Sequence, residues 1–310
     1  MSFLFDSFEG WKAIIEEKKV SLFQPVIEYE INEKGSEEQS ILLGLEKALD
    51  VMFDAVDSGL TEDMVSRSGM INNGAKKVYN HGVSVLGENF QKVIARALAA
   101  KEVNSCMGRV VAAPTAGASG IIPGVLYTLK DIHSIEKKTL VEALLVSAGI
   151  GLIIDNKASL AGAVGGCQAE TGSAAAMASG AIVYCLGGDF LQVSNAVGIT
   201  IQCMLGLVCD PVAGLVEVPC VVRNASAAAI AFSSAQIAMA GVDAVIPVDE
   251  CIEAMGEIGQ SMEERYKETA LGGLAATKTG KALSKKILIS DIQILGEEEV
   301  LPEKPSNKAC

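Results

Sequence analysis

The chain has 310 residues, half of them hydrophobic, and a formal net charge of −13 at pH 7. This length is enough to bury a large core, as one large domain or two small ones. The negative charge repels phosphate backbones, and the aromatic content of 5% leaves few side chains for stacking on bases. Composition therefore excludes nucleic acid as a partner.

The first twelve residues carry Asp6 and Glu9 before any basic residue and contain no long apolar run. Because a secretory signal requires a positive start followed by an apolar stretch, we expect a cytoplasmic protein. In that reducing compartment the eight cysteines are not a disulfide framework. Each one is expected to be a core residue, a metal ligand or a redox group.

The first hundred residues are charged and amphipathic. Apolar residues at helical spacing predict a helix over residues 41–56 and another over residues 88–101. The segment 66–74, Ser-Arg-Ser-Gly-Met-Ile-Asn-Asn-Gly, predicts a loop between them.

From Gly108 onward, long Ala-, Gly-, Val- and Ile-rich segments alternate with short Gly, Pro and Asn breaks. Ala-rich windows favour helix, and small residues let helix backbones approach closely. The prediction is an all-α protein with a single large domain of buried Ala/Gly-rich helices over residues 1–296. Residues 1–50 form an amphipathic N-terminal segment of this domain, and residues 297–310 a mobile C-terminal tail.

The most apolar runs, residues 140–154, 196–209 and 225–242, raise the alternative of a small-residue-rich membrane transporter. The first two runs contain Glu142 and Gln202, and the third reaches spanning length only by including several serines and a glutamine. These runs favour helices buried in a soluble core, so no membrane association is expected.

The segment 108–120 places the hydroxyls of Thr115 and Ser119 and the glycines Gly117 and Gly120 just before an apolar helix predicted over residues 121–129. Exposed backbone N–H groups at a helix start make an anion pocket, which suits a substrate carboxylate. A tight loop with an ordinary N-cap is the alternative.

Two further segments carry cysteines. Cys167 lies in a Gly-rich stretch, and Cys209 and Cys220 flank a rigid turn with two prolines. Thiolates are the usual ligands of iron–sulfur clusters, but this spacing matches neither Cys-x-x-Cys nor a ferredoxin pattern. From the pattern alone, buried structural cysteine is the commoner explanation. Three other cysteines within apolar helical stretches are assigned to the core: Cys185, Cys203 and Cys251.

Taken together, the segments resemble the alpha chain of the bacterial iron–sulfur L-serine dehydratases. The matching segments occur in the same order between about residues 51 and 280: residues 112–120, 166–170, 209–220 with 223–225, and 266–275. The resemblance implies dehydration and deamination of L-serine to pyruvate and ammonia. It also implies that Cys167, Cys209 and Cys220 bind a four-iron, four-sulfur (4Fe-4S) cluster held by loops between helices, with one iron free to act on the substrate as a Lewis acid.

Two departures from the family pattern matter. Single-chain members also carry an N-terminal domain with a Ser-His-Thr motif, whereas this chain has only His81 and His133, neither in such a motif. It therefore looks like the alpha subunit of a heteromer with a separate beta subunit. Some relatives end in a cysteine shortly after the Gly-Gly-Leu-Ala segment. Here Cys310 comes much later and remains a candidate fourth ligand.

The substrate carboxylate is assigned first to the loop with Thr115, Gly117, Ser119 and Gly120, and second to the loop with Ser68 and Asn73. Asn156, Ser159 and Asn224 are candidates to hold the amino group or orient the cluster. His81 is the candidate general base on this chain, since imidazole titrates near neutrality. The domain that this chain lacks is the other source of a base.

Three other functions remain open at this stage. Pyridoxal phosphate chemistry requires a Schiff-base lysine, for which Lys157 is the candidate, but the matched cysteines favour iron. A related iron–sulfur lyase such as a cysteine desulfidase is the alternative within enzymes. A non-catalytic scaffold that holds a cluster for stability or redox sensing is the third.

Overall fold

The computed structural model describes residues 5–298, and the side chains of residues 5–289. These residues form thirteen α-helices, a π-helix and three 3₁₀ turns, with isolated bridges in place of strands. The all-α, single-domain prediction is confirmed. The α-helices are α1 (Phe8–Lys18), α2 (Gln24–Lys34), α3 (Glu38–Thr61), α4 (Gly74–Tyr79), α5 (Glu88–Ser105), α6 (Ile121–His133), α7 (Lys137–Lys157), α8 (Gly162–Gly165), α9 (Ser173–Cys185), α10 (Phe190–Met204), α11 (Cys220–Met239), α12 (Val248–Ser261) and α13 (Lys278–Glu298). The shorter elements are the π-helix η1 (Gln168–Gly172) and the turns η2 (Val212–Gly214), η3 (Glu264–Tyr266) and η4 (Gly273–Ala276).

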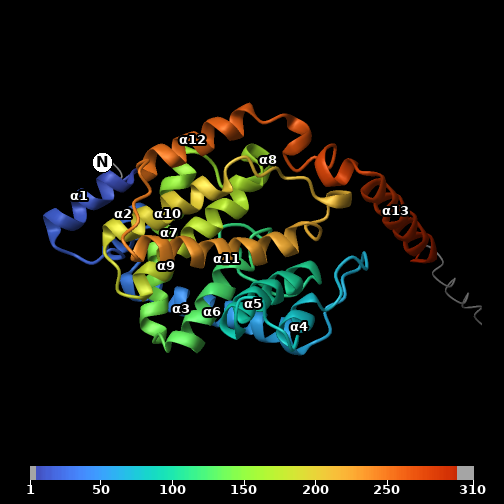
Figure 1. The fold of residues 1–310 in the computed structure, drawn as a ribbon, viewed down its shortest axis with the longest axis horizontal. Helices are drawn as coiled ribbons and strands as arrows, with labels where there is room; N and C mark the ends of the chain where they lie inside the picture. Colours follow the sequence, from blue (N-terminus) through green and yellow to red (C-terminus); the bar gives the residue numbers. More distant parts are fainter. Residues whose placement is uncertain (1–4, 299–310) are drawn as a thin grey trace, which may run out of the picture.

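Helix α9 is the centre of the fold and packs against α6, α7, α10 and α11. All of its residues except Tyr184 are buried, as expected for a helix that is Ala-rich on every side. In Figure 1, α11 crosses the middle of the molecule, with α3 to α6 below it and α8 and α12 above it.

Small residues allow the helices to approach closely. A Cβ on Gly124 of α6 would lie 2.6 Å from the backbone nitrogen of Ala97 on α5. A Cβ on Gly59 of α3 would lie 2.3 Å from the carbonyl oxygen of Ala99. The Ala-rich face of α5 therefore packs backbone to backbone with two neighbours, which explains the abundance of Gly and Ala.

The N-terminal helices are part of the domain. Trp11 of α1 is fully buried and packs edge-on against Phe190 of α10. The carboxylate of Asp249 on α12 accepts hydrogen bonds from the backbone N–H groups of Phe8 and Glu9, at 3.0 and 3.2 Å. The amphipathic segment expected over residues 1–50 thus contributes α1, α2 and the first half of α3 to the domain.

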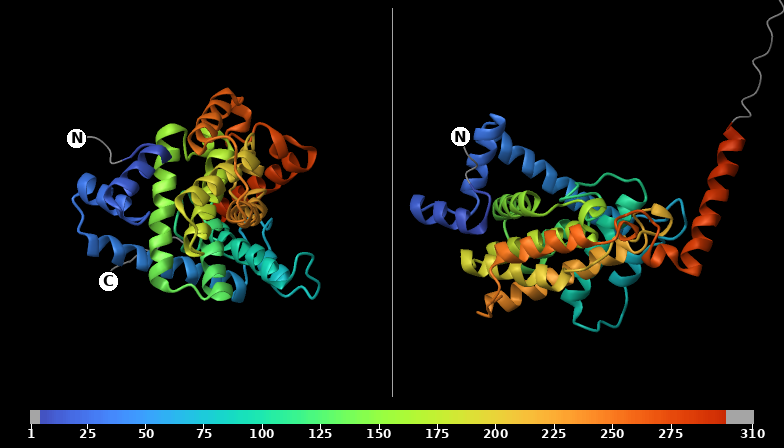
Figure 2. Two further views of the ribbon diagram at one scale, coloured as in Figure 1. Left: turned by 60° about the vertical axis from the view of Figure 1, so that its left-hand side comes forward. Right: turned by 90° about the horizontal axis from the view of Figure 1, so that it is seen from above.

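Helix α13 projects away from the other helices in the right-hand view of Figure 2, and it packs on η2 and η4. It ends at Glu298, two residues beyond the expected domain boundary. The rest of the tail, including Cys310, lies outside the described residues.

One helix among the described residues, α7, is long and apolar enough to cross a membrane. Its most apolar window is 67% buried inside the protein, where α7 packs against α9 and the N-terminal helices α2 and α3. The core helix of a globular domain has the same properties.

Candidate active site

The three cysteines singled out by the resemblance come from three different segments and lie close together. Cys167 directly precedes the π-helix η1, Cys209 follows α10, and Cys220 begins α11. Their exposed fractions are 2%, 3% and 6%. Burial raises the pKa of all three thiols, and the negative charge of Cys167 further raises the pKa of Cys209 and Cys220.

The Cys209 segment is held by the Tyr266–Ala275 motif. The backbone N–H of Cys209 donates to the carbonyl oxygen of Tyr266 at 2.8 Å, and the N–H of Glu268 donates back to the carbonyl oxygen of Cys209 at 2.9 Å. The next residue, Asp210, accepts a 2.7 Å hydrogen bond from the N–H of Leu274 and pairs with Arg223 at 2.8 Å. The motif therefore fixes the cysteine loop by its backbone.

The backbone conformation of Gly273 and its close approach to Asp210 explain why the 266–275 motif has a glycine at this position. Its φ of +55° favours glycine, and a Cβ there would lie 2.2 Å from a carboxylate oxygen of Asp210. Glu268 also has a positive φ, +63°, which is uncommon for a residue with a side chain. Backbone strain of this kind is typical of residues at functional sites.

Glu170 is the central carboxylate of the site and lies in η1, three residues after Cys167. Thr115 donates a hydrogen bond to its Oε1, and a Cβ on Gly117 would lie 2.1 Å from the same oxygen. A Cβ on Gly162 would lie 3.2 Å from Cys209 Sγ and 3.3 Å from Glu170 Oε2. Two glycines thus make room for the carboxylate, which is 8% exposed.

The π-helix determines where these side chains point. Its wider turn places Thr171 Oγ1 2.9 Å from Cys167 Sγ, at the junction with α9. π-helical turns are rare and often occur at functional sites, because the extra residue redirects the neighbouring side chains. The guanidinium of Arg223 also interacts with Cys167 and opposes the effect of burial on the pKa of this thiol.

Lys101 of α5 is a fully buried cation beside the site. Burial lowers its pKa to about 8, and Cys220, Glu170 and Glu217 oppose this shift. Lys101 is therefore still mostly charged at neutral pH. The carboxylate of Glu217 accepts hydrogen bonds from Ser66 at 2.7 Å and from Ser68 at 2.5 Å.

The donor set fits an iron–sulfur cluster. Three buried thiols and the buried carboxylate of Glu170 lie together, with the exposed side chain of Glu268 beside them, and all can ionise together only if a cation lies among them. Within residues 5–298, no three His, Cys, Asp or Glu side chains surround a single point as one metal ion would require. A cubane cluster offers a separate iron to each thiolate, so its ligands need not share a point.

Several predicted substrate ligands have internal roles instead. Ser119 is fully buried and donates to the carbonyl oxygen of Ala116 at 2.8 Å. Asn224 is fully buried as well, and its amide accepts from the N–H of Gly120 at 2.9 Å and donates to the carbonyl oxygens of Gly117 and Cys220, each at 2.8 Å. Ser119, Gly120 and Asn224 therefore build the loop around the site, and their assignment as substrate ligands stays a prediction.

The remaining candidates divide between the site and its surroundings. Thr115 and Gly117 lie against the carboxylate of Glu170, and Ser68 donates to the carboxylate of Glu217. Asn73 precedes α4, and its side-chain oxygen accepts a 2.8 Å hydrogen bond from the N–H of Met64, so it shapes the 66–74 loop. Asn156 is exposed on the last turn of α7, and Ser159 Oγ accepts from the N–H of Ala161 at 3.0 Å.

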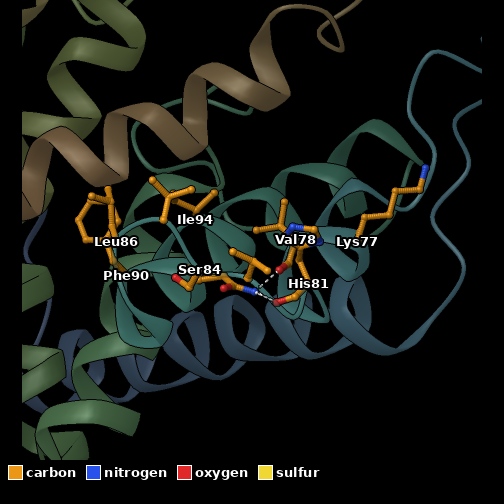
Figure 3. Close-up of a pocket in the computed structure, with 10 residues that line it drawn as sticks. Lys77, Val78, His81, Ser84, Leu86, Phe90 and Ile94 are labelled. Carbon is orange, nitrogen blue, oxygen red and sulfur yellow. Dashed lines mark hydrogen bonds between the residues drawn. The ribbon is translucent and has the colours of Figure 1, made fainter.

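His81 lies in a separate place. It lines an apolar groove of about 380 Å³ between α4 and α5, together with Val78, Leu86, Phe90 and Ile94. Figure 3 shows these side chains around the groove, with Gln91 donating to the carbonyl oxygens of Val78 and His81. The groups whose charges act on the three thiols do not include His81, and its assignment as the general base stays a prediction.

The sequence analysis misjudged one of the other cysteines and overlooked several charged residues. Cys185 and Cys251 are buried as predicted, but Cys203 is exposed. Glu170, Glu217, Glu268 and Lys101 were not selected, although the first two and Lys101 carry charge inside otherwise apolar or Gly-rich segments. A charge in such a segment is the signal that points to them.

Comparison of the sequence with known proteins shows the family of this chain. The family described as serine dehydratase alpha chain matches residues 17–275. The "L-serine dehydratase, alpha chain" of Peptoniphilus asaccharolyticus is 44% identical over 278 residues, which are 89% of this chain and 95% of that protein. The "Probable L-serine dehydratase, alpha chain" of Bacillus subtilis is 43% identical, over 90% of this chain and 95% of that protein.

Longer relatives match over part of their length. The "L-serine dehydratase" of Streptomyces coelicolor is 40% identical over 246 residues, which are 77% of this chain and 54% of that protein. Neither the membrane transporter nor the cysteine desulfidase is favoured by these matches. The extent of the agreement with the two alpha chains shows that the chain belongs to the serine dehydratase alpha chain family.

Proposed function

We propose that this chain is the catalytic alpha subunit of an L-serine dehydratase and that Cys167, Cys209 and Cys220 bind its 4Fe-4S cluster. The observation that carries the proposal is the convergence of three buried thiols, from three segments, beside the carboxylate of Glu170. Thiolates are the usual ligands of such clusters.

The site also suits an amino acid. Carboxylate oxygens of Glu170 and Glu268 both lie within 3.5 Å of the point where a Cβ on Gly162 would be. The absence of a side chain there leaves two carboxylates facing the same spot, which matches the positive ammonium group of serine. The hydroxyl of Thr115 lies on the other oxygen of Glu170 and fixes its orientation.

Loss of water from serine removes a weakly acidic Cα proton and expels hydroxide. A cluster with a free iron supplies a Lewis acid for the departing hydroxyl group. The chain's own contribution is to orient the substrate and to exclude water, since the thiols and Glu170 are nearly inaccessible to solvent. The enamine product gives pyruvate and ammonia in water.

We further propose that a separate beta chain completes the enzyme. The relatives named alpha chains imply a second kind of subunit, and this chain matches about half of the longer Streptomyces protein. The loop between α4 and α5 exposes Val83, Val85 and Leu86 by 71%, 93% and 66%, beside the groove of Figure 3. A patch of this kind is typical of a surface that a partner covers.

The test is to purify the chain without oxygen, alone and together with the beta chain of the same organism, and to measure iron, sulfide and pyruvate formation. We expect about four irons per alpha chain and rapid turnover of L-serine only in the two-chain preparation. Iron-free protein that is inhibited by hydroxylamine would instead indicate pyridoxal phosphate. Release of sulfide from cysteine without turnover of serine would indicate the desulfidase.

A further inference from the structure

Gln168 is a fully buried polar residue that directly follows Cys167 in the sequence. It is 0% exposed, and both polar atoms of its side-chain amide have partners in other segments. Nε2 donates to the carbonyl oxygen of Met255 on α12 at 2.9 Å, and Oε1 accepts from the N–H of Gly206 at 2.8 Å. Because each amide atom is hydrogen-bonded, the side chain can be buried and can fix the segments that it joins.

The backbone of Gln168 makes a further connection to the same place. Its N–H donates to the carbonyl oxygen of Leu207 at 2.9 Å. Gly206 and Leu207 lie between the end of α10 and Cys209. The residue that follows one thiol is therefore hydrogen-bonded twice to the segment that precedes another.

Glycines let these segments approach closely. A Cβ on Gly166, whose φ is +76°, would lie 3.0 Å from the carbonyl oxygen of Leu207. A Cβ on Gly259 of α12 would lie 2.9 Å from Cα of Gly165 and 3.4 Å from Nε2 of Gln168. The turn before Gln168 is thus packed between α12 and the 206–207 segment, and Gln168 supplies the polar connection to both.

We infer that Gln168 is a positioning residue: its amide and its backbone N–H set the placement of the Cys167 thiol relative to Cys209. The 266–275 motif holds Cys209 by the backbone of Cys209 itself, and Gln168 joins the residues that precede Cys209 to the Cys167 turn. That the thiols bind iron rests on the proposed function, whereas their placement by Gln168 rests on these hydrogen bonds.

Three variants separate hydrogen bonding from side-chain volume. Gln168→Met keeps the length of the side chain and leaves Met255 and Gly206 without their partners, so the Cys167 turn is free to move. Gln168→Glu should behave like the parent, because a buried carboxyl group is held neutral and then offers one donor and one acceptor. Gln202→Met is the matched control: it removes a 2.9 Å hydrogen bond from a glutamine amide to Ala244, in a segment that carries none of the three thiols.

The probe is phenylarsine oxide, a trivalent arsenical that bonds to two neighbouring thiols with loss of water. Its binding is measured on the full chain, reduced and free of iron, so the result depends on neither cluster nor turnover. The Cys220→Ser background leaves the pair Cys167 and Cys209, and the Cys167→Ser background leaves Cys209 and Cys220. Only binding that is lost on adding Cys209→Ser is counted.

In the Cys220→Ser background, Gln168→Met should weaken binding of the arsenical by about tenfold or more. In the Cys167→Ser background the same substitution should leave binding unchanged, and Gln202→Met should have no effect in either. Unchanged binding in the first background, or equal weakening in both, would overturn the inference, since a general loss of stability acts on both pairs. Binding by Gln168→Glu as weak as by Gln168→Met would overturn it too. Should Gln168→Met fail to fold, Gln168→Asn stays polar, is too short to reach both partners, and carries the same test.

The two proposals can fail separately. A wild-type chain that binds the arsenical but incorporates no iron would remove the proposed function and leave the role of Gln168 standing. An enzyme that carries iron and consumes serine, with arsenical binding insensitive to Gln168, would remove only the inference.

Discussion

The side-chain amide of Asn224 donates a 2.8 Å hydrogen bond to the carbonyl oxygen of Gly117, so α11 is tied directly to the loop that carries Thr115. The same amide also binds the carbonyl oxygen of Cys220 and the N–H of Gly120. One buried residue thus sets the position of a predicted cluster ligand relative to the loop that holds Glu170.

Replacing Asn224 by Ala should destabilise the protein by about 3 kcal/mol, because three buried hydrogen-bonding groups lose their partner. Urea denaturation of the variant and the wild type measures this difference. Ser226→Ala on the same helix is a suitable comparison and should change stability little. An unfolding midpoint for Asn224→Ala equal to that of the wild type would contradict this role.

The thiol assignment predicts that Cys167→Ser, Cys209→Ser and Cys220→Ser each lose iron and activity. Cys185→Ser is the matched control, since Cys185 is also buried but lies at the end of α9. Iron and acid-labile sulfide per chain, measured without oxygen, distinguish the two groups. Full iron content in all three variants would reject the ligand set.

Gly117→Ala should abolish most activity, because the added Cβ would lie 2.1 Å from the Glu170 carboxylate and must displace it. Gly44→Ala provides the control: Gly44 lies in α3 with no atom near its Cβ position, so alanine there should leave activity unchanged and stabilise the helix by up to about 1 kcal/mol. Steady-state kinetics and thermal unfolding of both variants test the pair. Normal turnover by Gly117→Ala would show that Glu170 has no role.

The lowered pKa of Lys101 has a consequence for stability. The pKa is about 8 in the folded protein and 10.5 in the unfolded chain, so the unfolded state binds more protons between these values. Stability therefore rises with pH through that window relative to Lys101→Met, by about 3 kcal/mol in total, and the difference is constant below about pH 7. Urea denaturation of both proteins from pH 7 to 10.5 measures it. A stability difference that falls as pH rises would have the wrong sign.

The exposed loop between α4 and α5 predicts the beta-chain contact. Val85→Asp should weaken association of the two chains by about tenfold or more, because a charge would be buried in an apolar interface. Leu191→Asp, at a position 64% exposed on α10, is the control and should leave association unchanged. Analytical ultracentrifugation of the mixed chains reports the difference. Equal association of the two variants would place the contact elsewhere.

Much of the fold follows from local sequence. The Ala-rich windows that become α7, α9 and α11 have few alternatives to helix, and the 3.6-residue spacing over residues 41–56 gives α3. The exposure of Cys203 could not be predicted from the sequence, because α10 is apolar on more than one side and its pattern does not indicate which side faces solvent. Burial there depends on neighbours distant in the sequence.

The site followed from sequence only where residues could be matched to a family. Thr115 and Glu170 are separated by 55 positions, and the contact between them depends on how α6 and α9 pack. Nothing local distinguishes Lys101 from a surface lysine except its apolar neighbours. His81 was selected for its side-chain chemistry alone, and the packing of α4 on α5 placed it in a different groove.

The π-helical turn at Gln168–Gly172 has a consequence for how insertions and deletions are tolerated. Removing one residue from this turn would restore ordinary α-helical hydrogen bonding, so α9 would keep its helicity and its packing in the core. Each residue of an α-helix contributes a rotation of about 100°, so the same deletion would turn Cys167 and its neighbours to a different face. Deletion of one residue here would therefore leave a folded chain in which Cys167 no longer lies beside Cys209 and Cys220. Deletion of one residue in an exposed loop, such as residues 80–87, would leave the three thiols in place.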